Sequence, residues 1–427
     1  MKPFSGKKLL IIGGSLNDIN ILEAAHELGC YVICCDRNTE YETKARAKLL
    51  ADEAWDIDYS KTDEIVERCK DAGVDGVIAG YNDFRCQHAA IISERLGLPF
   101  YATPSQIEIT KNKKAFKELA EKYGINTPKS ICYDNEVPES EREKVVFPSI
   151  VKPVDNGGRR GISVCHNREE LDKAIDYAFA SSVCKTIIIE DFIEGTEIAA
   201  IYTVADSKIS LSIINDKHLA ILEDGTVTKL SNAGITPSKF YGEYVKNIDG
   251  PVKDFIKGID IKNGVVFFQG IANEKEIKIF EMGFRLNGAN DYKAIRRQNG
   301  TDYMKMLISH SLTGSMGDNL ENDDARFEKQ LCTFCMYVNK GVVGKVDCST
   351  LDNLPGVVSY SLWAKSGQII PDDGTTLQRA LIAKLETDSL EQMADVINTV
   401  QNNVVFEDEN GKNMLFPPFD TNRLLLS

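Results

Sequence analysis

A lysine and a glycine-rich loop stand close together in the first half of the chain. Lys152 ends an apolar stretch that begins at Ser149, and Gly157, Gly158 and Gly161 follow it. Glycines leave backbone N–H groups open to an anion, because no side chain covers them. A lysine ammonium meets phosphate as a point charge. The pattern indicates phosphate binding, and the ordinary alternative is a turn between two strands.

Carboxylates follow the next strand pattern. Residues 186–189 are β-branched, Glu190 and Asp191 come directly after them, and Glu197 opens a further apolar stretch. Upstream, Lys113 begins a helical pattern. Any one of these side chains alone is ordinary on a protein surface. The specific feature is their order: a lysine, a lysine with its glycine loop, then carboxylates at strand ends.

A third set of residues predicts a metal site. Residues 264–270 form an alternating strand pattern with Gln269 as the polar member, and the returning strand carries Glu281 and then Arg285. Two antiparallel strands would bring Gln269 and Glu281 to the same end. Because hard oxygen ligands suit Mg²⁺, this hairpin is a candidate magnesium site.

The composition restricts the class of protein. The chain has 427 residues, which suggests two to four domains, and its net charge of −14 argues against nucleic acid or an anionic membrane as partner. Eleven cysteines are scattered from Cys30 to Cys348, a usage that indicates a reduced, cytoplasmic chain. The N-terminus has no signal-peptide pattern, and no apolar run is long enough to span a bilayer.

Short strands alternate with helices over the first hundred residues, which predicts an open, mostly parallel sheet. Gly13 and Gly14 follow the first strand and Asp36 ends the second, so a dinucleotide site is an alternative there. The incomplete glycine spacing favours plain packing of a helix on the sheet. Asn82 follows a later strand, at the edge where such sheets place ligands, and is a substrate candidate. A helix N-cap is its structural alternative.

The ordered set of lysines, glycine loop and carboxylates resembles the ATP-grasp family over roughly residues 105–315. The resemblance implies α/β and α+β architecture in three parts. These are an N-terminal open parallel α/β (pre-ATP-grasp) domain over residues 1–104, an ATP-grasp domain of two α+β lobes over 105–320, and a small C-terminal α+β lobe over 321–427. The small flexible lobe lies within residues 113–190.

The resemblance also implies roles in binding ATP. The lysines would neutralise the phosphates, the glycine loop would close over them, and the strand end near residue 190 would hold the adenine. Glu190 would accept a hydrogen bond from the adenine amino group, and Glu197 would accept from the ribose hydroxyls. The implied ATP-binding residues are Lys113, Lys152, Asn156, Gly157, Gly158, Gly161, Glu190, Asp191, Ile193, Glu197 and Lys217.

In the family, the metal ligands follow a pattern of Glu or Gln on one strand and Glu-x-Asn-x-Arg on the next. Gln269, Glu281 and Arg285 match this pattern, but Gly283 stands where the asparagine is usual. Asn287 from the next turn is the candidate replacement ligand, and a water in that position is the alternative. If the missing ligand matters, an asparagine at position 283 should preserve or raise activity.

The resemblance implies an ATP-dependent carboxylate–amine ligase that forms an acyl-phosphate intermediate and uses ATP with Mg²⁺, or Mn²⁺ in its place. Arg285 and Lys152 would be catalytic, because they would stabilise charge on the transferring group. Arg296 is a candidate for holding a substrate carboxylate. The substrates would be a small carboxylate and an amine, and the chain a homodimer as is common among relatives. The alternatives are a nucleotide-binding regulatory protein with an impaired metal site, which Gly283 motivates, and a carboxyphosphate-forming enzyme of the carboxylase type.

Overall fold

The computed structural model describes residues 2–155, 161–317 and 320–425. Its N-terminal sheet is parallel and has the strand order β3 (Glu53–Trp55), β2 (Tyr31–Cys35), β1 (Lys8–Ile12) and β4 (Gly76–Ile78). The helices of this part are α1 (Ile19–Leu28), α2 (Thr62–Ala72) and α3 (Asp83–Leu96). A helix from much later in the chain, α11 (Tyr303–Thr313), also packs on α1 and β4. The predicted open parallel sheet is confirmed.

A small antiparallel sheet follows, in the order β5 (Ser130–Asp134), β8 (Thr186–Asp191), β6 (Ser149–Pro153) and β7 (Ser163–Cys165). Helix α7 (Arg168–Ser181) packs on it through Leu171, Ala174, Ile175 and Ala178, which are spaced along one helical face. Two helices, α4 (Pro104–Lys111) and α5 (Lys113–Lys122), connect this lobe to the rest of the molecule and contact β13 of the large sheet.

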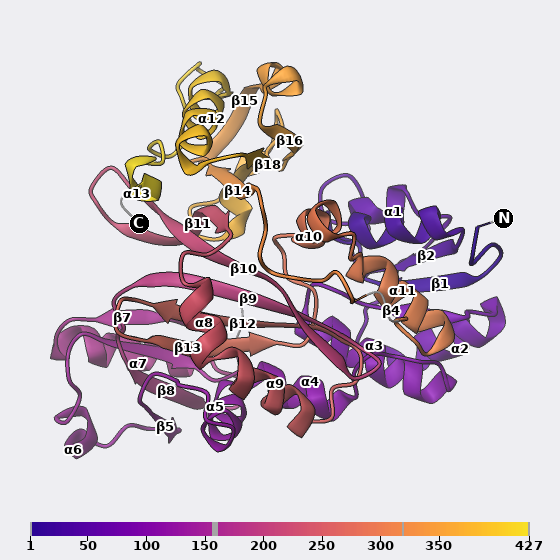
Figure 1. Ribbon diagram of the computed structural model, residues 1–427, viewed down its shortest axis with the longest axis horizontal. Coiled ribbons are helices and arrows are strands. Elements are labelled where there is room, and N and C mark those ends of the chain that lie inside the picture. The colour runs from indigo at the N-terminus through magenta and orange to yellow at the C-terminus, as the bar shows by residue number, and fades with distance from the viewer. Residues whose placement is uncertain (1, 156–160, 318–319, 426–427) are drawn as a thin grey trace.

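The largest sheet has eight antiparallel strands and runs through the middle of the molecule (Figure 1). Its order is β13 (Ile277–Gly283), β12 (Gly264–Ala272), β9 (Thr196–Ala205), β10 (Lys208–Ile221), β11 (Val227–Thr236), β14 (Gln330–Tyr337), β18 (Arg379–Thr387) and β16 (Val357–Leu362). Strand β11 pairs directly with β14. The sheet therefore continues across the boundary predicted near residue 320.

The remaining elements cover this sheet and complete the C-terminal part. Helices α8 (Tyr241–Asn247) and α9 (Asp249–Gly258) pack on each other, and α12 (Leu390–Asn403) lies on β14 and β18. A three-stranded sheet has the order β17 (Ile369–Ile370), β15 (Gly341–Asp347), β19 (Val405–Asp408). The short elements are α6 (Glu139–Arg142), α10 (Tyr292–Asn299) and α13 (Asn422–Leu425), with 3₁₀ turns at Arg46–Leu49, Ser349–Asn353 and Thr376–Gln378. Within the described residues, none of the helices is long and apolar enough to cross a membrane.

Candidate active site

A cavity of about 1650 Å³ lies where the small sheet, the large sheet and the N-terminal part meet. It is lined by twelve of the predicted site residues: Lys113, Lys152, Glu190, Asp191, Ile193, Glu197, Lys217, Gln269, Glu281, Arg285, Asn287 and Arg296. Among the described residues, Asn82 and Gly161 do not line it. Asn156, Gly157 and Gly158 lie outside the residues that the structure describes. Side chains from distant parts of the sequence thus share one cavity.

The register of the large sheet explains this convergence. One row of paired residues crosses the sheet as Glu281, Gln269, Ala199 and Asn215. Because alternate residues of a strand face the same side, the next row on that side begins two residues away. It runs through Glu197, Lys217, Gly234, Thr333 and Lys384. All these residues line the cavity, so two neighbouring rows of one sheet form its floor.

Glu190 is buried and holds two lysines. Its carboxylate lies 2.6 Å from Lys152 Nζ and 2.7 Å from Lys117 Nζ. Burial acts to raise the pKa of Glu190, but the two ammonium groups outweigh it and keep the pKa below its ordinary value. The carboxylate therefore stays ionised and fixes both lysines. This arrangement does not support the adenine contact implied for the Glu190 side chain, because its oxygens already face ammonium groups.

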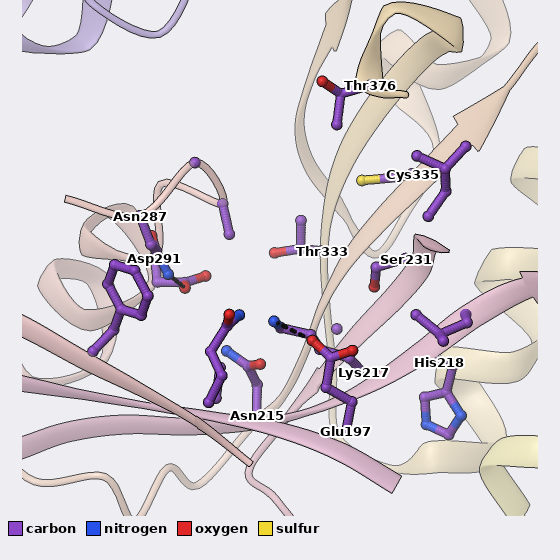
Figure 2. A pocket seen from close by; sticks show the side chains of 18 of the residues that line it. Glu197, Asn215, Lys217, His218, Ser231, Asn287, Asp291, Thr333, Cys335 and Thr376 are labelled. Atoms are coloured by element: carbon purple, nitrogen blue, oxygen red, sulfur yellow. Dashed lines mark hydrogen bonds and ion pairs between the residues drawn. The ribbon is translucent and has the colours of Figure 1, made fainter. Parts of the chain in front are cut away.

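Glu197 and Lys217 form the second ion pair of the site. Lys217 Nζ donates to Glu197 Oε1 at 2.8 Å, across neighbouring strands β10 and β9. In Figure 2 this pair lies on one side of the cavity, with Asn215 beside it and Asn287 and Asp291 opposite. Lys217 is thus paired with Glu197, the residue expected to bind the ribose. The sequence predicted instead that Lys217 would neutralise the ATP phosphates.

Arg285 is fixed by a partner from the N-terminal part of the chain. Its Nε lies 2.9 Å from Asp83 Oδ2, and its guanidinium lies 5.0 Å from the centre of the Phe267 ring. The neighbouring Asn82 caps helix α3 by accepting from the backbone N–H of Arg85 at 3.1 Å. The structure therefore supports the N-cap interpretation of Asn82 and gives its substrate role no support. The loop does reach the site, but through Asp83.

The place of the expected asparagine is filled by an aromatic ring. Gly283 pairs with Phe267 across β13 and β12, and a Cβ built on Gly283 would lie 2.3 Å from Phe267 Cζ. Such a contact is impossible without moving the ring. The Phe267 ring therefore needs a glycine at position 283, and the same ring lies against the Arg285 guanidinium. This argues against the expectation that an asparagine at 283 would preserve or raise activity.

Three oxygen-bearing side chains on the cavity wall fit a hard divalent cation. Gln269 and Glu281 face each other in register, and Asn287 Oδ1 is buried without a hydrogen-bond partner among the described residues. Asn287 Nδ2 donates to Asp291 at 2.7 Å, so the Oδ1 atom of Asn287 is the one available to a cation. One carboxylate and two amide oxygens are the donor types that Mg²⁺ prefers.

The turn after the first strand is occupied by the chain's own carboxylate. The backbone N–H and the hydroxyl of Ser15 donate to Asp18 at 2.7 and 2.6 Å, and Arg85 pairs with both Asp18 and Asp36. A phosphate in this turn would meet two buried carboxylates instead of open N–H groups. The structure favours helix–sheet packing over the dinucleotide alternative.

The cavity residues and ion partners that were not predicted from the sequence include Asp83, Lys117, Asp291 and Lys384. Lys117 stands one helical turn after Lys113, and this spacing of two lysines on a buried face was a usable signal. Lys384 had none, because it belongs to β18 and reaches the site only through the order of the strands. Burial lowers the pKa of Lys384, and the nearby Asp291 opposes this.

We expect Lys152→Met to weaken nucleotide binding about tenfold or more, since a charge-assisted contact contributes about 1.5–3 kcal/mol and each 1.4 kcal/mol is tenfold. The methionine keeps the packing of the stem, and Glu190 retains Lys117 as a partner. Calorimetric titration with Mg–ADP measures the affinity. Lys173→Met, on the exposed face of α7, is the matched control. An unchanged affinity for Lys152→Met would contradict the phosphate role.

Comparison with known proteins finds a matching family model and several related enzymes. The family model described as the D-ala D-ala ligase C-terminus matches residues 116–224. Phosphoribosylamine–glycine ligase of Fusobacterium nucleatum is 23% identical over 270 residues, covering 59% of this chain and 62% of that protein. Formate-dependent phosphoribosylglycinamide formyltransferase of Trichormus variabilis is 30% identical over 193 residues, covering 44% and 48%. The chain spans about half to three fifths of the length of these curated relatives.

Solved structures extend the likeness to nearly the whole chain. An L-amino acid ligase from Bacillus licheniformis has a TM-score of 0.80 at 18% identity, covering 95% of this chain and 100% of that one. The biotin carboxylase domain of Hydrogenobacter thermophilus 2-oxoglutarate carboxylase, solved with MgADP and bicarbonate, has a TM-score of 0.76 at 20% identity, covering 94% and 90%. At this identity the likeness shows the fold. Residues 116–224 match the family model and nearly the whole chain shares the fold of these ligases, which confirms the resemblance to the ATP-grasp family.

Proposed function

We propose that this protein is an ATP-dependent carboxylate–amine ligase that releases ADP and phosphate. The observation that carries the proposal is the shared cavity, in which Lys113, Lys152, Glu197, Glu281 and Arg285 all take part. Phosphoryl transfer to a carboxylate requires cations for the phosphates, carboxylates for the ribose and a metal, and an arginine for the reacting group.

In this proposal the small lobe and the large sheet hold ATP between them. Lys152, fixed by Glu190, and Lys113 face the phosphates, while Glu197 accepts from the ribose. The backbone of Asp191 and Ile193 at the end of β8 lines the adenine side of the cavity. Gln269, Glu281 and Asn287 would hold Mg²⁺, or Mn²⁺ in its place, and the bound cation would neutralise phosphate charge.

The reaction has two steps. A substrate carboxylate oxygen attacks the γ-phosphorus, the bond to the bridging oxygen breaks, and ADP leaves with the electron pair. Arg285, held by Asp83, stabilises the negative charge of the acyl phosphate. An amine then attacks the acyl carbon, the carbon–oxygen bond breaks, and phosphate leaves with one oxygen of the original carboxylate. Arg296, which pairs with Asp302 at 3.2 Å, lies at the substrate side of the cavity.

The relatives support small-molecule substrates, because those named above are enzymes for small carboxylates and amines. We propose a homodimer, because the biotin carboxylase domain of 2-oxoglutarate carboxylase forms a dimer in its solved structure. The eleven cysteines are all described and none forms a disulfide, which supports the cytoplasmic location expected from the sequence. We propose three domains, over residues 1–104, 105–320 and 321–427, of which the second and third are joined by the pairing of β11 with β14.

A phosphate-release assay over pairs of small carboxylates and amines tests the proposal, with nucleotide binding measured separately. Release that requires both partners is the expected result. With an ¹⁸O-labelled carboxylate, one label should appear in the phosphate, because the acyl phosphate breaks at its carbon–oxygen bond. Nucleotide binding without release for any pair would overturn the ligase and leave the regulatory alternative. Failure to bind nucleotide would overturn both.

A further inference from the structure

The floor of the cavity has an opening in its second row of side chains. Gly234 stands between Lys217 on β10 and Thr333 on β14, and Lys384 on β18 follows in the same row. With strands about 4.8 Å apart, the Cα atoms of Lys217 and Thr333 are ~10 Å from each other. Among the residues that the structure describes, a Cβ built on Gly234 would meet only Thr333 Cβ, at 4.0 Å. The glycine therefore leaves a hollow that faces the cavity.

No local geometry requires glycine at this position. The backbone of Gly234 does not adopt the left-handed conformation that glycine favours, and a Cβ would make no close contact. Glycine also weakens the middle of a strand, since it brings no side chain to pack. What Gly234 provides is room above the sheet, next to polar side chains.

Lys384 follows Thr333 in the same row and lines the same cavity. Its ammonium donates to Thr333 Oγ1 at 2.7 Å and to the carbonyl of Ala289. An ammonium has three N–H groups, and the remaining acidic neighbour, Asp291 Oδ1, lies 4.0 Å away, beyond hydrogen-bond distance. Thr333 accepts from Lys384, so its own O–H can donate. Both residues line the cavity, and Figure 2 shows Thr333 between Asn287 and Ser231.

Charged side chains near the hollow include Lys217, Glu197, Asp291 and Lys293. Lys217 is held by Glu197, and Asp291 uses one oxygen for Asn287 Nδ2. Asp291 offsets part of the Lys384 charge from 4.0 Å, without a hydrogen bond to its ammonium group. A ligand with a compact anionic group can therefore pair with Lys384 and accept from Thr333, with the floor kept clear by Gly234.

We propose that the hollow over Gly234, walled by Lys384 and Thr333, binds a substrate carboxylate that is not activated by ATP and remains in the product. This rests on the proposed ligase function and narrows its substrate class. One substrate carries a carboxylate in addition to the reacting groups. A simple pair such as bicarbonate and ammonia is excluded, since neither has a group for this subsite.

Titration with matched ligands tests the subsite without turnover. Succinate, L-alanine and L-glutamate are titrated with and without Mg–ADP, beside succinamide and L-alaninamide, whose carboxylates are replaced by amides. We expect at least one carboxylate to bind at millimolar concentration, and its amide counterpart to bind at least tenfold more weakly. Gly234→Val and Lys384→Met should each reduce the carboxylate affinity about tenfold or more.

The variants need folding controls. Gly234→Ala gives a graded filling of the same hollow, and Lys345→Met removes an exposed strand lysine outside the cavity lining. Melting temperature shows whether each variant folds. Carboxylates that bind no better than amides, or that bind a folded Gly234→Val chain as well as the wild type, would overturn the subsite. Failure of the ligase proposal is seen separately, in nucleotide binding and phosphate release.

Discussion

Glu281→Gln is expected to reduce phosphate release about 100-fold or more, which corresponds to about 3 kcal/mol of lost transition-state stabilisation. The substitution keeps the shape of the side chain and removes its charge. Glu281 is the carboxylate among the three proposed cation ligands, and it pairs with Gln269 across the hairpin. Two amides in register would bind a hard divalent cation poorly.

Nucleotide affinity separates this effect from general damage. The proposed adenine and ribose contacts are on β8 and β9, whereas Glu281 is on β13, so binding of metal-free ADP should change little. Glu276→Gln on the turn of the same hairpin is the matched control and should retain full activity, because Glu276 does not line the cavity and its carboxylate pairs with Lys278. Normal turnover by Glu281→Gln would show that the metal assignment is wrong.

Gly283→Asn is expected to lower both activity and stability, the reverse of what the missing asparagine suggested from the sequence. The new Cβ would lie 2.3 Å from Phe267 Cζ and 2.5 Å from Cε1. Forcing a side chain into a packed position costs about 1–3 kcal/mol. The displaced ring also supports the Arg285 guanidinium, so we expect at least a tenfold loss of phosphate release together with a lower melting temperature.

A double mutant tests the steric cause. Phe267→Leu removes the ring atoms that collide with position 283 and keeps an apolar side chain. The two substitutions should therefore be non-additive, with the Phe267→Leu/Gly283→Asn chain more stable than the sum of the single changes predicts. Wild-type activity and an unchanged melting temperature for Gly283→Asn alone would contradict this view and would revive the metal-ligand expectation.

Local patterns predicted most of the elements and their order. Alternating strands and helices indicated the N-terminal parallel sheet, and the period of two along β12 and β13 placed Gln269 opposite Glu281, as the register has it. Predictions of this kind succeed because they depend on residues that are near one another in the chain.

Contacts between distant segments were not predictable in the same way. Asp83 and Arg285 meet although about two hundred residues separate them, and the sequence pointed to the neighbouring Asn82 instead. The two lysines that pair with Glu190 come from helix α5 and strand β6. Lys384 reaches the cavity because β14 and β18 extend the large sheet. Strand order of this kind follows from the packing of the whole molecule, and no short pattern encodes it.

The pairing of β11 with β14 has a consequence for how the molecule can move. A hinge between the central and C-terminal parts would have to break a row of backbone hydrogen bonds from Ala233 to Thr236. Cutting the chain there would also expose two unprotected strand edges, which favour aggregation. We therefore expect the central and C-terminal parts to stay joined through the eight-stranded sheet while substrates enter and leave.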